Sequence, residues 1–355
     1  MFLIETEEQS LLRDMLRRYF REGRFGAEPG GTVLTRDDWS GLAELGLPGL
    51  LLEERWGGSG CGAQELAITA SEMGRALISA PFAGTVAAAG LIQKFASEEQ
   101  KQRLLPEIAN GGIVPLFIDA RDGSLSLDQD GQVSGARDVE CGMDVDLIVA
   151  AVQAGDGDQR VVLIEHLADA IAQRAVDDRP GISAITLHSA RTEALASGSA
   201  AAAGLAETDD LVSLARLADI VGAMDGMFRL TVEHVKTREQ FGKPLAQFQV
   251  LQHRTAEMFT ELEMARSMLL NLVAHTASGH DALRRRHAAA SAHLRILTAL
   301  DRIGPEAIQM HGGMGMAWEH RVGHLVRRAI ANGLRMGSDS AALDNLGHLP
   351  AFHLV

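Results

Sequence analysis

The sequence predicts a mainly α-helical protein with a central β block. Apolar residues recur at three- and four-residue spacing in the first and last parts of the chain, which is the pattern of amphipathic helices. Short extended runs separated by turn residues fill the middle, and alanine is abundant while aromatic residues make up only 4%. We expect an N-terminal all-α domain over residues 1–112, a middle domain over 113–203 and a C-terminal four-helix bundle over 204–355.

Helical periodicity in the N-terminal domain extends from Glu7 to Asn110, as in LLRDMLRRYF, QELAITASEMGRAL and SEEQKQRLLPEIANG. Ser97 and Gln100 have the spacing of a capping box, in which each side chain bonds a free backbone N–H at the start of a helix. The pair Gly111–Gly112 follows this helix and predicts its end.

The middle domain consists of short apolar runs, among them VPLFIDA, DLIVAAV, RVVLIEH and AITLHSAR. Turn signals such as Asp130–Gly131 and Pro180–Gly181 separate these runs. Runs of this length between such turns are typical of hairpin-connected strands. We therefore expect an antiparallel β unit, like a sandwich or a barrel.

Helical periodicity returns after Asp209 and predicts four helices, at about residues 210–238, 246–279, 282–303 and 319–345. Asp209 and Asp210 precede the first of these helices. A side-chain oxygen at that position can accept a bond from a free N–H of the first turn. We expect these two residues to be N-cap residues.

Charge and composition exclude several classes of protein. The net charge of −14 argues against a nucleic-acid partner, which requires clustered Lys and Arg. Two cysteines indicate no disulfide scaffold. No apolar run reaches the length of a membrane span, and the acidic start lacks the basic region of a signal peptide. We expect a cytoplasmic protein without membrane contact.

The chain has 13 histidines, but none pairs at His-x-x-x-His spacing with a supporting carboxylate. The sequence therefore predicts no metal site. His311 and His320 flank a glycine-rich turn, and we expect them to pack or to cap helices.

Two segments carry the most specific signal. The first is VKTREQFGKPLAQFQVLQHRTAEM, residues 235–258, and the second is AIQMHGGMGMAWEH, residues 307–320. In this order, on a helix–sheet–helix chain, the two segments resemble the acyl-CoA dehydrogenase family. The three-block pattern extends that resemblance over essentially the whole chain.

The resemblance implies roles for Arg238, Phe241, Gln309, Gly312 and Gly313. In the family these groups bind the adenosine-diphosphate half of an FAD that belongs to the neighbouring subunit, so the protein is expected to be at least a dimer. A guanidinium is a fixed fork of donors suited to a diphosphate. The aromatic ring would lie near the adenine, and the glutamine could bond an adenosine edge. Glycines allow the backbone to approach a cofactor closely.

The resemblance also implies α,β-dehydrogenation of an acyl-CoA thioester, in which a carboxylate takes the α-proton and the flavin takes a hydride. FAD is the implied cofactor and an electron-transfer flavoprotein the implied electron acceptor. The family's usual base lies 23 residues after the second glycine of the turn, and counting from Gly313 leads to Met336. A thioether cannot accept the proton, so the usual base is absent.

Asp219, in LADIVGAMDGMF, is the catalytic base that we hypothesise. It lies in the middle of a predicted helix among apolar residues, where an unpaired carboxylate is costly to bury. Gly222 and Gly226 lie on the same helical face and would leave room for a flat group. The alternative is a structural role, in which Asp219 pairs with Arg216 or with a partner helix.

The family's loop that holds the flavin ring is reduced here to Asp122–Gly123–Ser124, within FIDARDGSLSL. The chain thus keeps the half-site that it would lend to a neighbour better than the half-site that it would use itself. Two hypotheses follow: an acyl-CoA dehydrogenase with its own base, or a non-catalytic partner that supplies the adenosine-diphosphate half-site. Either is expected in a homo- or heterotetramer with a sister subunit. A flavin-binding module without dehydrogenase activity is a third hypothesis.

Overall fold

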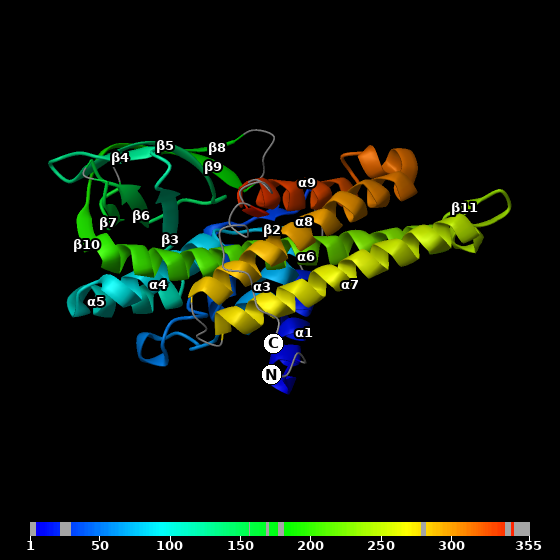
Figure 1. Ribbon diagram of the computed structural model, residues 1–355, viewed down its shortest axis with the longest axis horizontal. Helices are drawn as coiled ribbons and strands as arrows, with labels where there is room; N and C mark the ends of the chain where they lie inside the picture. Colours follow the sequence, from blue (N-terminus) through cyan, green and yellow to red (C-terminus); the bar gives the residue numbers. More distant parts are fainter. Residues whose placement is uncertain are drawn as a thin grey trace. The chain divides into compact units, whose positions relative to one another are not determined.

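The computed structural model describes residues 5–21, 30–155, 157–167, 170–176, 181–277, 282–337 and 342–343. The mainly helical fold with a central β block is confirmed (Figure 1). The chain divides into two compact units, each assembled from separate segments. Unit 1 comprises Met1–Thr32, Ala63–Ile78 and Ser213–Val355, and unit 2 comprises Val33–Gly62 and Ser79–Val212. The three-domain boundaries at residues 112 and 203 remain a prediction.

Unit 1 consists mostly of helices, of which α7 and α8 pack against each other. Its elements are α1 (Glu7–Arg21), α3 (Ala63–Ala76), the C-terminal part of α6 (Gly198–Thr237), β11 (Glu239–Gln240), β12 (Lys243–Pro244), the 3-10 helix η3 (Leu245–Gln247), α7 (Gln249–Ala277), α8 (Ala282–His311), the 3-10 helix η4 (Gly312–Met316) and α9 (Arg321–Leu334). The predicted end of the last helix lies partly outside the described residues.

Helices α3 and α6 cross in unit 1 at a distance that only glycine allows. A Cβ added to Gly74 of α3 would lie 2.1 Å from the backbone oxygen of Asp219, and a Cβ added to Gly222 of α6 would lie 1.9 Å from the backbone oxygen of Ser71. Real Cβ atoms do not approach oxygen so closely. The space beside Gly222, which the sequence predicts to be open for a flat group, is therefore filled by α3.

Unit 2 contains the β block and the helices that cover it. Its elements are α2 (Arg36–Glu44), the 3-10 helix η2 (Glu54–Trp56), α4 (Phe82–Phe95), α5 (Glu98–Ala109), β3 (Pro115–Ala120), β4 (Leu125–Leu127), β5 (Gln132–Glu140), β6 (Leu147–Gln153), β7 (Gln159–Ile164), β8 (Ile171–Ala175), β9 (Ile182–Arg191), β10 (Glu193–Ser197) and the N-terminal part of α6. The short strands β1 (Thr32–Val33) and β2 (Ile78–Ser79) pair with each other.

The capping box predicted at the start of α5 is confirmed. The Ser97 hydroxyl accepts a bond of 3.3 Å from the Gln100 N–H, and the Gln100 side-chain oxygen accepts one of 2.9 Å from the Ser97 N–H. Both bonds satisfy backbone donors that have no partner inside the helix.

The β block forms two four-stranded sheets, with strand orders β10-β7-β6-β3 and β4-β5-β9-β8. Among the described residues, the strand pairings in these two sheets are antiparallel except one: β3 and β6 run parallel, with Leu116 opposite Ile148. The expectation of a purely antiparallel unit is therefore wrong at this pair. Residues 147–152 of β6 are all buried, which is typical of a strand covered on both faces.

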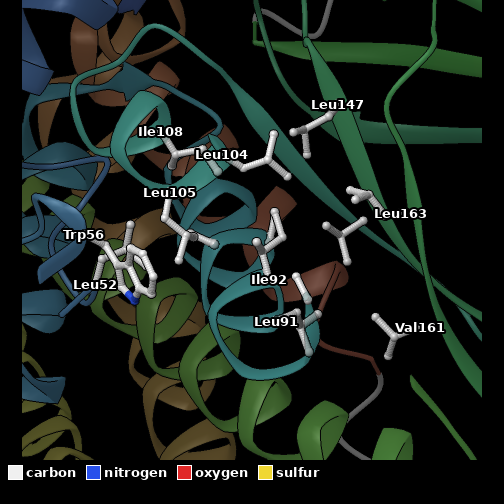
Figure 2. Packing of buried hydrophobic residues seen from close by; sticks show 14 of the residues in the cluster. Leu52, Trp56, Leu91, Ile92, Leu104, Leu105, Ile108, Leu147, Val161 and Leu163 are labelled. Atoms are coloured by element: carbon white, nitrogen blue, oxygen red, sulfur yellow. The ribbon is translucent and has the colours of Figure 1, made fainter. Parts of the chain in front are cut away.

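The core of unit 2 lies between α4, α5 and the first sheet. Figure 2 shows Leu91 and Ile92 of α4 and Leu104 of α5 among the side chains of β6 and β7, which include Leu147 and Leu163. These residues are at most 2% exposed. Burial of each such side chain contributes about 1.5–3 kcal/mol, so this core fixes the sheet against the two helices.

Helix α6 begins earlier than the sequence predicts. Because it starts at Gly198, Asp209 and Asp210 lie inside the helix, and the expected N-cap role is wrong. Alanines after Gly198 favour the longer helix, since alanine has the highest helix propensity. Asp209 instead accepts bonds of 3.0 and 2.7 Å from the Arg121 guanidinium, and burial raises the pKa of its carboxyl.

Candidate functional site

The two motif segments meet at one end of unit 1. There the C-terminal end of α6, the β11–β12 hairpin and the start of α7 lie near the end of α8, on the right of Figure 1. The His234 ring of α6 stacks on His311 at the end of α8, with ring centroids 4.6 Å apart and planes 30° apart. His311 also contacts His320, at a centroid distance of 4.5 Å. These contacts join the Arg238 segment to the Gly312–Gly313 turn.

His311 and His320 pack and cap, as expected from the sequence. His320 is the N-cap of α9, and its Nδ1 accepts a bond of 3.2 Å from the Val322 N–H. His311 is 5% exposed, and its Nδ1 lies 2.7 Å from the Ala307 carbonyl oxygen. That contact makes Nδ1 the donor and Nε2 the acceptor in the neutral ring.

The Nε2 atom of His311 is buried and has no hydrogen-bond partner within the described part of the chain. Buried polar atoms in folded proteins are nearly always bonded, to protein, water or ligand. The cluster of His234, His311 and His320 therefore holds one buried acceptor without a partner among the described residues. This atom lies directly before the exposed Gly312–Gly313 turn.

Two rings of the cluster, His234 and His320, have lowered pKa values. Burial, together with His311, His320 and Arg238 nearby, lowers the pKa of His234. Burial and His311 likewise lower the pKa of His320. Because the unperturbed pKa is about 6.5, both rings are uncharged at neutral pH.

The β11–β12 hairpin presents an aromatic ring to the outside. Phe241 is 90% exposed and has a φ of 55°, in the left-handed region that non-glycine residues rarely adopt. Such a conformation costs of order 1–3 kcal/mol and is concentrated at binding sites. Gly242, with a φ of 79°, completes the turn. The strain keeps a large apolar ring in water.

Arg238 lies at the junction of α6 and this hairpin and is exposed. Its backbone N–H bonds the His234 carbonyl oxygen at 2.8 Å, and its own carbonyl oxygen accepts a bond of 2.8 Å from the Leu245 N–H. Its guanidinium makes no hydrogen bond or ion pair with any described residue. The backbone is thus fixed while the charged group remains available.

The Gly312–Gly313 turn is equally open. Gly312 has a φ of 61°, and neither glycine would have a heavy atom within 4 Å of an added Cβ. Gln309 is exposed one helical turn before it. Two apolar side chains after the turn, Met316 at 77% and Trp318 at 55%, are also exposed.

Sequence reasoning did not single out His234, Met316 and Trp318 for this site. His234 lies four residues before Arg238 and therefore on the same helical face, which was the available signal. Trp318 closely follows the glycine turn in sequence.

Asp219 lies in a different environment, on the face of α6 that packs against α9. Its carboxylate accepts bonds from Arg328 Nε at 2.9 and 3.1 Å, from Arg328 Nη2 at 2.6 Å and from Asn332 Nδ2 at 2.8 Å. The residue is 6% exposed. This pairing with a partner helix is the structural role that the sequence left open, while the role as base remains a prediction.

Asp219 is also far from the nucleotide-end residues. The 19 residues from Asp219 to Arg238 extend about 28 Å along a helix that rises 1.5 Å per residue. The structure thus groups Arg238, Phe241, Gln309 and the two glycines at one end of unit 1, and it does not bring Asp219 to them.

Two further segments correspond to the family's loop that holds the flavin ring and to the position of its usual base. The Asp122 carboxylate accepts bonds from the Ser124 N–H and from the Arg137 guanidinium. Burial acts to raise the pKa of Asp122, but these bonds lower it to about 2. Met336 is half-buried in a turn that ends at Gly337, with a φ of 93°.

Neither a metal-binding cluster nor a membrane-spanning helix occurs in the described residues. No group of three or more His, Cys, Asp or Glu side chains there could hold a metal ion. No helix in those same ranges combines the length and hydropathy needed to cross a bilayer.

Comparison with known proteins identifies the family to which this chain belongs. The acyl-CoA dehydrogenase N-terminal domain matches residues 6–112, and the acyl-CoA dehydrogenase C-terminal domain matches residues 213–348. The C-terminal match includes both motif segments. The chain belongs to the acyl-CoA dehydrogenase family.

Individual relatives agree with this assignment. The chain is 29% identical over 309 residues to acyl-CoA dehydrogenase IpdE2 of Mycobacterium tuberculosis, a match that covers 87% of this chain and 85% of the relative. Its fold resembles the ChsE4-ChsE5 complex from Mycobacterium tuberculosis, with a TM-score of 0.85, 21% identity and coverage of 99% and 100% of the two chains. It also resembles a glutaryl-CoA dehydrogenase from Mycobacterium smegmatis in complex with FADH2, with a TM-score of 0.81, 17% identity and coverage of 97% and 94%.

Proposed function

We propose that this chain acts in FAD-dependent α,β-dehydrogenation of an acyl-CoA thioester, in an assembly where it holds the adenosine-diphosphate half of a flavin site shared with another subunit. The observation that carries the proposal is the end of unit 1. An exposed guanidinium, an exposed ring and an open glycine turn lie there beside a buried acceptor without a partner.

The residues at this end fit the nucleotide half of FAD. The Arg238 guanidinium can donate two parallel N–H bonds to a diphosphate. The exposed Phe241 ring offers a face for an adenine, and stacking removes apolar surface from water. Gly312 and Gly313 have no side chain to keep a ligand from the backbone, and His311 Nε2 can accept a bond from an amino or hydroxyl group.

The location of the proton-accepting carboxylate decides whether this chain is catalytic by itself or is a partner in a heteromeric enzyme. Bound FAD supplies the acceptor for the hydride that leaves the β-carbon, and the α-proton must pass to a carboxylate. The usual position holds Met336, and the Asp219 carboxylate accepts four bonds from Arg328 and Asn332. We therefore assign the base to a sister subunit, and to this chain the role of partner in a heteromeric dehydrogenase.

The fold similarity to a two-component complex, ChsE4-ChsE5, supports this heteromeric form. The FADH2 bound by the similar glutaryl-CoA dehydrogenase supports a flavin as the cofactor. An electron-transfer flavoprotein is the acceptor that we propose for the reduced flavin, in keeping with the family.

A second candidate keeps catalysis within the chain, with Asp219 as the base. The buried carboxylate in the middle of α6 favours it. Before Asp219 could accept a proton, at least one of its carboxylate oxygens would have to lose its bonds from Arg328 and Asn332.

The two candidates differ in what the isolated chain can do. The chain is purified alone and after co-expression with the products of neighbouring genes, and flavin content, native mass and anaerobic bleaching by acyl-CoA thioesters are measured. The partner role predicts no bleaching by the chain alone, and bleaching by a hetero-oligomer. Stoichiometric flavin and bleaching in the chain alone, abolished by Asp219→Asn with flavin retained, would reject the partner role and establish the second candidate.

A further inference from the structure

A cavity of about 330 Å³ lies within unit 1, away from the nucleotide end, among helices α1, α3, α6 and α7. Arginines from all four helices line it: Arg13, Arg17, Arg75, Arg229 and Arg266. The other ionisable residues in its lining are Glu5, Glu72 and Asp225. The lining therefore has two positive charges in excess, in a chain with a net charge of −14.

Three of these arginines converge on one buried acid. Glu72 is 1% exposed, and its carboxylate lies 2.9 Å from Arg13 Nη1, 3.1 Å from Arg17 Nε and 2.7 Å from Arg75 Nη2. Arg13 is neutralised a second time by Glu5. One carboxylate cannot balance two further guanidinium groups, so positive charge remains at Arg17 and Arg75.

On the opposite side, Asp225 is 6% exposed and pairs with two arginines. Arg229 Nε lies 2.7 Å from its Oδ2, and Arg266 Nη2 bonds its Oδ1. Glu263, outside the cavity lining, also pairs with Arg266. Two acids thus balance two arginines on this side, and Arg229, which bonds only Asp225 among the described residues, has the more exposed guanidinium.

Arg17 and Arg229 each use only Nε to bond protein among the described residues. Both Nη groups of each remain as donors, from α1 and from α6, and these side chains are 32% and 62% exposed. The donors are thus reachable from water. Burying a charged donor without a partner is costly, whereas partial exposure allows a ligand to enter and bond it.

The shape and chemistry of the cavity define the ligand. Guanidinium groups that project from different helices meet an oxyanion from several directions, which suits the oxygens of a tetrahedral phosphate better than a planar carboxylate. Val221, Leu269 and Leu270 form an apolar wall in the same cavity. A volume of this size accommodates a small organic ligand.

We propose that this cavity is a binding site for a phosphate ester with a small apolar substituent, separate from the flavin site. The phosphate neutralises the excess charge at Arg17 and Arg75 and accepts bonds from the Nη groups of Arg17 and Arg229, and the substituent lies against the apolar wall. This assignment rests on the charges and donors of the cavity alone and does not depend on the proposed dehydrogenase role.

Titration calorimetry on the full chain at low ionic strength tests the site with phenyl phosphate, inorganic phosphate and benzoate as probes. The expected order of affinity is phenyl phosphate, then inorganic phosphate, then benzoate. Added salt should weaken binding, because exposed charge interactions are screened. Arg17→Ala and Arg229→Ala should each weaken phenyl phosphate binding about tenfold or more, the effect of one lost bond to a charged group.

Both substitutions leave each buried acid with a cationic partner: Glu72 keeps Arg13 and Arg75, and Asp225 keeps Arg266. The variants are therefore expected to fold, which a thermal melt verifies. Arg103→Ala, which removes an exposed pair with Glu165 in unit 2, is the matched control. Absence of saturable phenyl phosphate binding, or an equal loss in the control, would refute the site.

Discussion

Asp219 illustrates how one residue can support two interpretations until its partners are known. An aspartate in the middle of an apolar helix requires either a functional role or a counter-ion, because an unpaired carboxylate is costly to bury. Arg328 supplies that counter-ion from 109 residues away, and Asn332 adds a further donor. A pairing over such a separation leaves no local signature in the sequence.

Breaking this pair at one end should destabilise the protein strongly. In Asp219→Asn the Arg328 guanidinium, whose side chain is 12% exposed, would lose its charged partner. We expect a loss of about 3–5 kcal/mol in the free energy of unfolding, the usual cost of removing one partner of a buried ion pair. Urea unfolding at neutral pH measures it.

Replacing both residues provides the control for that prediction. The double variant Asp219→Leu, Arg328→Met removes both charges and should be more stable than Asp219→Asn, because paired burial of apolar side chains leaves no uncompensated charge. If the single substitution costs no more than the double one, the ion pair is not what holds α6 to α9.

The histidine cluster gives a pH dependence whose direction follows from its pKa values. The pKa of His234 is lowered in the folded protein, so below the unfolded pKa of about 6.5 the unfolded state binds more protons. Stability from this ring is therefore fully present above pH 6.5 and is lost as the pH falls toward the folded pKa. Melting temperatures between pH 7 and pH 5 should fall less steeply in His234→Asn than in the wild type.

His253, which is exposed on α7, is the matched position for that comparison. The variant His253→Asn should keep the wild-type slope of melting temperature against pH. An unchanged slope in His234→Asn would mean that the cluster does not contribute to acid sensitivity.

At the scale of elements, the crossing of α3 and α6 depends on glycine at Gly74 and Gly222. The sequence places Gly222 on the face of Asp219, which is correct, but it cannot say whether a ligand or a helix occupies the space. Close helix approach and ligand binding use the same residue type for the same reason, the missing Cβ. Tertiary contacts decide between them.

Gly222→Ala should therefore destabilise unit 1. The added methyl group would meet the Ser71 backbone oxygen, and forced separation of packed helices costs about 1–3 kcal/mol. Alanine's better helix propensity, about 1 kcal/mol, offsets part of this cost. Chemical unfolding measures the net change.

Gly90→Ala is the matched control, because Gly90 lies inside α4 with no heavy atom within 4 Å of an added Cβ. At Gly90 only the intrinsic helix propensity changes, so the free energy of unfolding should rise by up to about 1 kcal/mol. Equal effects at Gly90 and Gly222 would contradict the close crossing.

The elements that sequence reasoning predicted share local signals, and those it missed do not. The capping box of Ser97 and Gln100 is complete within four residues. The start of α6 at Gly198 was missed because the alanine-rich stretch after it carries no apolar periodicity. The parallel pairing of β3 with β6 depends on chain topology, which the strand patterns alone do not contain.

At the scale of the whole molecule, the chain exposes the groups that we propose for the nucleotide half of a flavin site. Arg238, where α6 meets the β11–β12 hairpin, and Phe241, in that hairpin, are solvent-exposed, while the Asp219 carboxylate is paired with Arg328 and Asn332. The sequence motifs predicted the exposed residues, but the His234–His311 contact that links their two segments is visible only in the structure. In the proposed assembly, a second subunit would complete this site.

The flavin content of Arg238→Ala tests the central claim most directly. The protein, with whichever sister subunit co-purifies, is compared with Arg103→Ala for flavin per protein and for native mass. Loss of a charge-assisted diphosphate contact, about 1.5–3 kcal/mol, predicts at least tenfold weaker FAD retention in Arg238→Ala with the assembly intact. Wild-type flavin occupancy in Arg238→Ala, or a monomeric flavoprotein, would contradict the shared half-site.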